Sequence, residues 1–229
     1  MLFRSGVSNK KTLRDKRGSI WTYDYDAAGR LIEERSPNVT ITRLNTADAT
    51  VTTSEAIVTR YDYNGLGQLK SQVEGYGTTE ARTTTFQYDV AGRRTFETLS
   101  VPGAASNIIT EYRYDAKNNL TRKLVQVNAS TTNSTWYVYD AMDRVRFTVD
   151  ALGDVSEQQY NATGEVVHVR RYASTISPPT STNVLTSVTI TANNQTDQVT
   201  QYAYDRVGRR VFTSEAFLDA AGEIGRAHV

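Results

Sequence analysis

Residues 23 to 31 read Tyr23-Asp24-Tyr25-Asp26-Ala27-Ala28-Gly29-Arg30-Leu31, and this stretch decides the fold because it recurs along the chain. Further copies, some of them degenerate, are Tyr61–Leu69, Phe86–Arg94, Tyr112–Leu120, Tyr137–Val145, Gln158–Val166 and Tyr202–Arg210. Their second aromatic residues are 38, 25, 26, 25, 21 and 44 positions apart, and 12 of the 14 tyrosines lie in these copies. Self-similarity at a nearly fixed period indicates a repeat architecture.

Each position of the motif has a mechanical role in a β-hairpin. Aromatic residues at i and i+2 project from one face of a strand. The Asp or Asn that follows can bond backbone N–H groups and open a turn, and Gly three residues later supplies the positive φ that closes it. Asn118 and Asp143 replace this Gly, and both residue types tolerate positive φ.

We therefore assign a structural role to the repeat positions. No residue is assigned to a catalytic, cofactor-binding or metal site. These positions are Tyr23, Tyr25, Asp26, Gly29, Arg30, Tyr61, Tyr63, Asn64, Gly67, Tyr88, Asp89, Gly92, Arg93, Tyr112, Tyr114, Asp115, Tyr137, Tyr139, Asp140, Arg144, Tyr160, Asn161, Gly164, Tyr202, Tyr204, Asp205, Gly208 and Arg209.

A second turn signal separates some of the copies, at Asp15–Gly18, Asp150–Gly153 and Asp219–Gly222. One period then holds two strands and two reversals, and no stretch keeps a helical apolar spacing. The sequence predicts an all-β fold of consecutive antiparallel β-hairpins, stacked into a curved or spiralling sheet. Hairpin turns are expected at Asp26–Gly29, Asn64–Gly67, Asp89–Gly92 and Asp205–Gly208, with the second tyrosines aligned as a ladder on one face.

The predicted array covers residues 6–222, about seven to eight repeats. Long polar insertions near 45–55 and 173–198, and the stretch 128–135, are expected to be surface loops. Val184–Thr191 alternates well enough to predict an extra strand inside the last insertion. Leu2–Ser5 and Glu223–His228 can be encoded by one DNA element, resembling a sequencing adapter, in opposite orientations. We interpret residues 1–5 and 223–229 as scars and expect the natural protein to extend beyond both.

Composition argues against several classes of function. The 26 basic and 25 acidic residues leave a net charge of +1, which favours neither nucleic acid nor an anionic membrane as a partner. The absence of cysteine removes disulfides and Cys-based metal sites. His168 is the one histidine before residue 223, too few for a His cluster or a Ser-His-Asp triad. No enzyme activity, cofactor or membrane insertion is expected.

The recurring Asp and Arg positions have two interpretations each. Asp26 and its equivalents could bind calcium, but each loop offers one carboxylate, so turn capping is favoured. Arg30, Arg93, Arg144 and Arg209 could form a basic ladder for nucleic acid, but the acidic turns favour ion pairing between hairpins.

The motif resembles the YD-repeat, or Rhs-repeat, family, whose pattern is close to Tyr23–Leu31 and whose likeness extends over roughly residues 13–222. The family includes Rhs polymorphic toxins, the C component of insecticidal Tc toxin complexes, wall-associated bacterial proteins and teneurins. The resemblance implies hairpins that spiral into a hollow shell, which in the toxins encloses a C-terminal effector. The aspartate-dependent self-cleavage segment of that family is not visible in this sequence, nor is an effector domain.

From this resemblance, the expected function is a structural scaffold in a secreted or cell-surface protein. Its expected partners are the rest of the shell, the enclosed effector and possible delivery-apparatus or cell-surface proteins. The alternative is an adhesion module, of a wall-associated type, that binds carbohydrate or protein.

Overall fold

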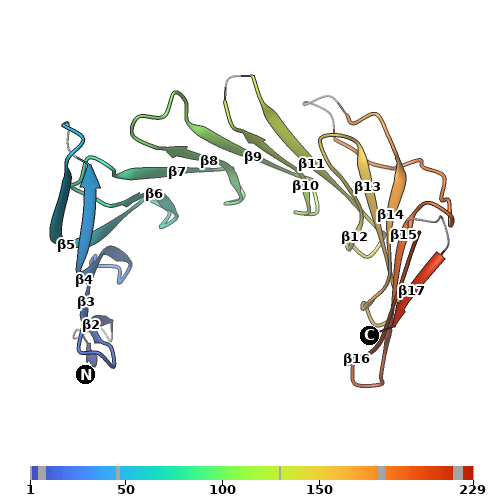
Figure 1. Ribbon diagram of the computed structural model, residues 1–229, viewed down its shortest axis with the longest axis horizontal. Helices are drawn as coiled ribbons and strands as arrows, with labels where there is room; N and C mark the ends of the chain where they lie inside the picture. The colour runs from blue at the N-terminus through green and yellow to red at the C-terminus, as the bar shows by residue number, and fades with distance from the viewer. Residues whose placement is uncertain are drawn as a thin grey trace. The chain divides into compact units, whose positions relative to one another are not determined.

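The computed structural model describes residues 2–4, 9–44, 47–128, 130–179, 184–218 and 224–228, and every regular element within these ranges is a β-strand (Figure 1). Two compact units divide the chain. Unit 1 comprises residues 1–109 and 127–129, and unit 2 comprises 110–126 and 130–229. None of the described residues belongs to a helix that is long and apolar enough to cross a membrane.

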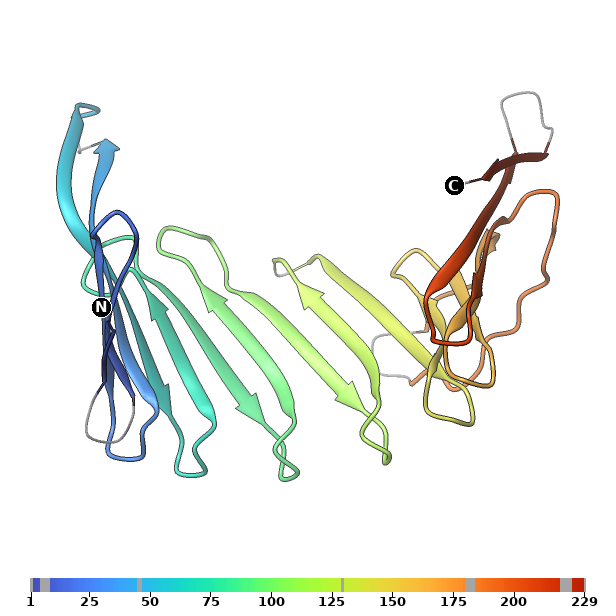
Figure 2. The ribbon, with the colours of Figure 1, turned by 90° about the horizontal axis from the view of Figure 1, so that it is seen from below.

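Unit 1 is a run of antiparallel strands, each hydrogen-bonded to the next along the chain. The strands are β1 (Leu2–Arg4), β2 (Lys10–Arg14), β3 (Ile20–Tyr25), β4 (Leu31–Leu44), β5 (Thr50–Tyr63), β6 (Leu69–Glu74), β7 (Arg82–Tyr88) and β8 (Arg94–Ser100). The turns that join β3 to β4, β5 to β6 and β7 to β8 lie along one edge of this unit (Figure 2).

Unit 2 repeats the arrangement, and β9 (Ile108–Tyr114) crosses the boundary into it and pairs with β10. The later strands pair in chain order as antiparallel neighbours. They are β10 (Leu120–Gln126), β11 (Thr132–Tyr139), β12 (Val145–Val149), β13 (Asp154–Tyr160), β14 (Val166–Thr175), β15 (Gln198–Tyr204), β16 (Arg210–Leu218) and β17 (Ile224–His228). The all-β class and the consecutive antiparallel hairpins are confirmed.

All four predicted hairpin turns are confirmed. In the first, the Gly29 N–H donates to Asp26 O over 3.0 Å and the Asp26 N–H donates to Arg30 O over 2.9 Å. The same pair of bonds closes the turns that begin at Asn64, Asp89 and Asp205. The turns Asp15–Gly18 and Asp150–Gly153 also form, whereas Asp219–Gly222 lies outside the described residues.

A β-bulge accompanies the repeated turn. The strand register shifts between Asp24 and Tyr25, and the same shift precedes the second tyrosine of most other copies. Gly29 has φ +79°, and the replacements Asn118 and Asp143 have φ +75° and +59°. A three-residue loop closed by a left-handed residue and a bulge is a common hairpin connection. Each copy therefore specifies the same local geometry.

The first polar insertion is a β-ribbon, so the loop predicted near residues 45–55 was wrong. Residues 50–55 belong to β5, and Thr42 lies opposite Thr52 in its pairing with β4. Asn45 and Thr46 lie outside the described residues. β-Branched Thr and Val suit a pleated strand even where both faces are exposed. The loop predicted at 128–135 is also too long, because β11 begins at Thr132.

The second insertion differs from the prediction in another way. β14 extends to Thr175, and β15 begins at Gln198. We call residues 176–197 the strap, of which 176–179 and 184–197 are described. The predicted strand at Val184–Thr191 does not form. Instead Leu185, Val188 and Ile190 pack on the face of the sheet. An alternating apolar pattern is therefore compatible with a segment that covers a sheet as well as with a strand.

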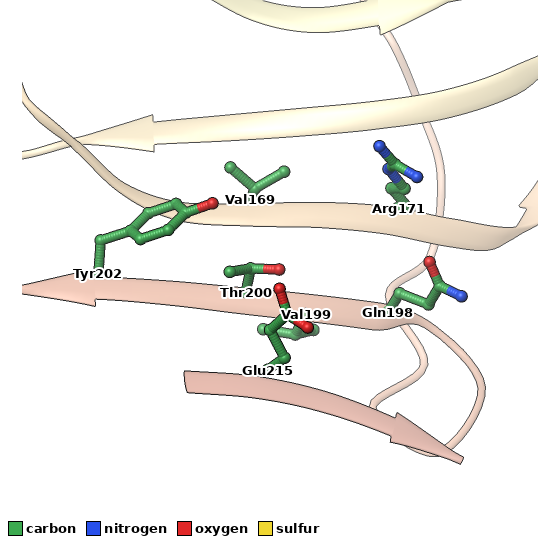
Figure 3. Close-up of a pocket in the computed structure, with 7 residues that line it drawn as sticks. All are labelled: Val169, Arg171, Gln198, Val199, Thr200, Tyr202 and Glu215. Carbon is green, nitrogen blue, oxygen red and sulfur yellow. The ribbon is translucent and has the colours of Figure 1, made fainter. Parts of the chain in front are cut away.

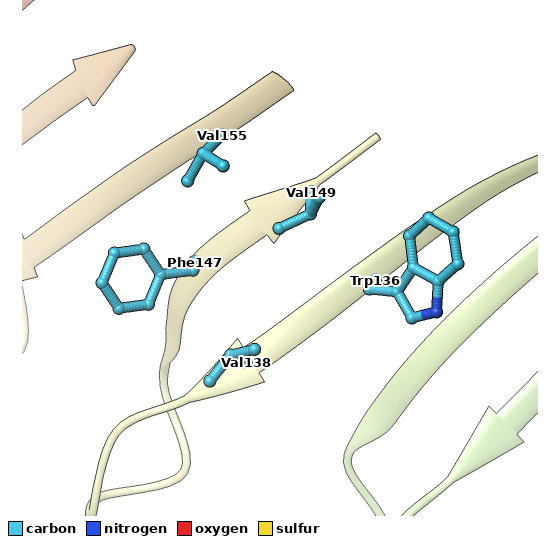
Figure 4. Close-up of a cluster of buried hydrophobic side chains, with 5 residues drawn as sticks. All are labelled: Trp136, Val138, Phe147, Val149 and Val155. Carbon is cyan, nitrogen blue, oxygen red and sulfur yellow. The ribbon is translucent and has the colours of Figure 1, made fainter. Parts of the chain in front are cut away.

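The core lies under this strap. Trp136, Val138, Phe147, Val149 and Val155 project from β11, β12 and β13 onto one side and form a buried cluster (Figure 4). Burying one such side chain stabilises the fold by about 1.5–3 kcal/mol. Among the described residues of unit 1, by contrast, Val58 is the one buried apolar side chain. Unit 1 therefore depends more on strand pairing and polar links than on a core.

Candidate functional site

The repeated turn is a polar clamp built by the Asp of each motif. Asp26 Oδ1 accepts the N–H groups of Ala28 and Arg30, both over 2.9 Å, while Oδ2 accepts the Arg30 Nε–H over 2.7 Å. The same three bonds recur around Asp89, Asp140 and Asp205. One carboxylate thus satisfies two backbone donors and orients a guanidinium.

This bonding keeps the turn carboxylates ionised. The pKa of Asp26 lies below its ordinary value, chiefly because the Arg30 backbone N–H bonds the carboxylate, and Asp89 and Asp205 have the same pKa shift and leading cause. At Asp140 the Arg144 side chain is the leading cause of the lowered pKa. Groups held this way are poorly suited to donate protons. Within the described ranges, no three potential ligands cluster to hold a metal ion.

Where Asn replaces the Asp of the clamp, the residue four positions later is also replaced, by one that can hydrogen-bond to Asn. Asn64 Oδ1 accepts the N–H groups of Leu66 and Gln68, and Asn64 Nδ2 donates to Gln68 Oε1 over 2.8 Å. At Asn161 the matching partner is Glu165. The motif's fourth and eighth residues therefore vary as complementary pairs. This signal is visible in the sequence, but reasoning from the turn alone missed it.

The arginines pair inside their own turns, so the expected ion pairing between hairpins was wrong. Arg30 Nη2 lies 2.7 Å from Asp26 Oδ2, and Arg144 Nη2 lies 2.7 Å from Asp140 Oδ2. Two of them, Arg30 and Arg144, also contact an aromatic ring of the next hairpin, and Arg144 Nη1 donates to Asn161 O there over 3.3 Å. The Arg30 guanidinium lies 4.7 Å from the centre of the Tyr63 ring. Because each arginine follows its aspartate by only four residues, the two side chains can form an ion pair within the same turn.

In five copies of the motif the second tyrosine links its hairpin to the one before it. Tyr63 Oη donates to Leu31 O over 2.8 Å, and Leu31 is the first residue after the preceding turn. The equivalent bonds are Tyr88 to Leu69 (2.8 Å), Tyr139 to Leu120 (2.9 Å), Tyr160 to Val145 (2.7 Å) and Tyr204 to Val166 (2.9 Å). Burial raises the pKa of Tyr63, so its hydroxyl stays a donor.

The remaining repeat positions support this arrangement. The first tyrosines Tyr23, Tyr61, Tyr112, Tyr137 and Tyr202 are half-buried strand residues two positions before the second ones. The turn glycines Gly29, Gly67, Gly92, Gly164 and Gly208 all have positive φ. Together these positions form a repeated structural joint.

A polar pocket lies elsewhere on unit 2, on one face of β14, β15 and β16. Its volume is about 430 Å³, and its side chains include Arg171, Gln198, Thr200, Tyr202 and Glu215 (Figure 3). The sequence motif contains only the tyrosine among these residues. Sequence reasoning therefore gave no indication of the pocket.

Comparisons with known proteins agree with the repeat geometry. The model of the RHS repeat matches residues 11–38, which hold the first copy of the motif and its turn. The segment 11–38 is thus an RHS repeat. No sequence among curated proteins matches it.

Solved structures share the fold of the array. The crystal structure of TcdB2-TccC3-TEV matches at TM-score 0.52 and 15% identity, over 99% of this chain and 13% of that chain. TcdB2-TccC3 without its hypervariable C-terminal region matches at TM-score 0.52 and 14% identity, again over 99% of this chain and 13% of the other. The array thus spans a small part of these larger proteins.

The anchors of the strap lie outside the RHS repeat pattern. Asp197 accepts the Ala173 and Asn193 N–H groups over 2.9 and 2.8 Å and pairs with Arg170 over 2.8 Å. At the other end, the Ile176 N–H donates to Gly153 O over 2.9 Å. These residues are distant in sequence, so only their contacts identify them.

Buried polar groups complete the face beneath the strap. Tyr172, one of the two tyrosines outside the motif, donates its hydroxyl to Glu157 Oε2 over 2.6 Å. Burial, together with this carboxylate, raises the pKa of Tyr172 to about 12. His168 is a half-buried strand residue, and burial lowers its pKa. The Tyr172–Glu157 bond thus links β14 to β13 beneath the strap.

Proposed function

We propose that this chain is a structural scaffold, a section of a β-hairpin shell that encloses a C-terminal effector in a larger secreted or surface protein. The observation that carries the proposal is the tyrosine bond between successive hairpins, as from Tyr139 to Leu120 O. Each bond ties one repeat to its neighbour in addition to the strand pairing. A wall assembled by such repeated joints can be extended without a deep core.

The chemistry of the turns also favours a scaffold. The carboxylates that recur most often, such as Asp26 and Asp89, have their oxygens committed to backbone and arginine donors. Pairing of each strand with its neighbours leaves few free edges, and free edges are sites of aggregation. A scaffold of this kind requires no cofactor. Its partners would be the remainder of the shell and the effector within it.

Protease protection in the complete polypeptide that carries this array tests the proposal. We expect the segment after the shell to resist protease when the array is native. Replacing Tyr139, Tyr160 and Tyr204 together by Phe removes three joints of unit 2 and should expose that segment. The control is Tyr76→Phe, which removes a hydroxyl from a tyrosine outside the motif.

A segment that is equally accessible in the unaltered protein and in the triple variant overturns enclosure. The alternative function, adhesion, is favoured by the exposed ribbon of β4 and β5, where Val39, Leu44 and Val51 are all exposed. Adhesion predicts that the chain binds cells directly and that Leu44→Ser together with Val51→Ser weakens the binding. Protease protection with no cell binding favours enclosure instead.

A further inference from the structure

The pocket on β14, β15 and β16 is formed by side chains that the strand register places on one face. Val169 lies opposite Thr200, and Arg171 lies opposite Gln198. Thr200 also lies opposite Glu215 on the next strand. Side chains opposite one another across antiparallel strands share a face. The pocket therefore has a row of polar groups across three strands, with an apolar Val169 at one side (Figure 3).

Two opposite charges in this pocket have no partner among the residues that the structure describes. Four other strand arginines of unit 2 each form an ion pair with a carboxylate: Arg113, Arg122, Arg146 and Arg170. Within the described residues, Arg171 and Glu215 form no ion pair and no side-chain hydrogen bond. Strand β15 lies between them, and their Cα atoms are two strands and two residues apart, roughly 12 Å. Each charge is thus available to a ligand.

We propose that this pocket binds a short linear peptide that carries a carboxylate toward Arg171 and an ammonium group toward Glu215. A guanidinium binds a carboxylate through two parallel hydrogen bonds. Gln198 and Thr200 lie between the two charges and can bond the amide groups of the ligand. A ligand whose carboxylate and ammonium group lie roughly 10 Å apart corresponds to about three extended residues. The volume of about 430 Å³ falls within the range of small-ligand sites.

The charge pair distinguishes this ligand from other classes. A nucleic-acid backbone would meet the Glu215 carboxylate with like charge. A neutral sugar would bond the amide and hydroxyl groups of Gln198 and Thr200 and would need neither the Arg171 nor the Glu215 charge. The inference concerns a second activity of the array and does not depend on enclosure of an effector.

Ligand-observed NMR saturation transfer on the whole chain tests the proposal with two peptide probes. Triglycine with free termini supplies its charges from the chain ends. Lys-Gly-Asp with both termini blocked supplies them from side chains. Binding of both identifies the charge pair itself as the ligand feature, whereas binding of triglycine alone restricts the site to peptide termini. Triglycine with both termini blocked should not bind.

Charge-altering variants then locate the site. Arg171→Gln and Glu215→Gln should each weaken binding about fivefold, because each removes one exposed charge contact. The matched control is Arg206→Gln, which changes an exposed arginine in a turn outside the pocket. The double variant Arg171→Glu with Glu215→Arg should regain binding, since a short peptide can bind in the reverse direction.

Any one of three results overturns the proposal. The first is equal binding of the blocked and free forms of triglycine, which would indicate a charge-independent site such as one for neutral sugars. The second is unchanged binding in both single variants. If the double variant stays as weak as the single ones, the two residues do not act as a charge pair and the proposal is likewise wrong.

Discussion

Replacing Gly153 by Ala tests whether the strap holds unit 2 together. A Cβ at this position would lie 1.9 Å from Ile176 O, whereas ordinary contact begins at 3.4 Å, so the strap backbone must move by about 1.5 Å. The positive φ of +89° adds about 1–2 kcal/mol of backbone strain for Ala. Losing the Ile176–Gly153 hydrogen bond costs about 1 kcal/mol more, and loosened packing of the strap adds about as much again.

We therefore expect Gly153→Ala to lower the free energy of unfolding by about 3–4 kcal/mol. Gly164→Ala is the matched control, because Gly164 has φ +92° and no atom within 4 Å of a Cβ. It should cost only the strain of about 1–2 kcal/mol. Urea denaturation followed by the fluorescence of the buried Trp136 measures both variants in a Trp21→Phe background. Equal destabilisation of the two variants would refute the argument that the strap makes a close and necessary contact here.

Two further predictions concern one tyrosine joint and one anchor of the strap in unit 2. Tyr139→Phe removes the donor to Leu120 O and should lower the free energy of unfolding by about 1 kcal/mol in urea denaturation; no change would mean that the bond adds nothing beyond strand pairing. Burial alone would raise the pKa of Asp197, but hydrogen bonds from Ala173, Asn193 and Arg170 outweigh it and the pKa is lowered. The stability from this carboxylate is thus present above the unfolded pKa of about 3.9 and lost as pH falls through the lower folded value. Asp197→Asn should be less stable than the unaltered chain at pH 7, with a difference that narrows below about pH 4; a constant difference over this range would contradict the prediction.

The strands and repeated turns could be derived from the sequence because their determinants are local. Asp26, Gly29 and Arg30 lie within five consecutive residues, and the hydrogen bonds that form the turn connect residues two to four positions apart. A local motif of this kind specifies its conformation wherever it recurs. The same reasoning placed the arginine pairing incorrectly, because it did not consider that a side chain four residues away could reach the carboxylate.

The strap and the pocket could not be derived in this way because their contacts are between distant residues. Residues 184–191 alternate like a strand. Packing on the sheet becomes more favourable than pairing only because β11 to β13 present an apolar face that the strap can cover. Likewise, nothing in the sequence around Arg171 or Glu215 indicates that a common face joins them across β15. The sequence by itself determined the hairpin, its turn and its repetition. The tertiary structure alone decided which faces are covered and which charges remain free, since both depend on how strands far apart in the chain are brought together.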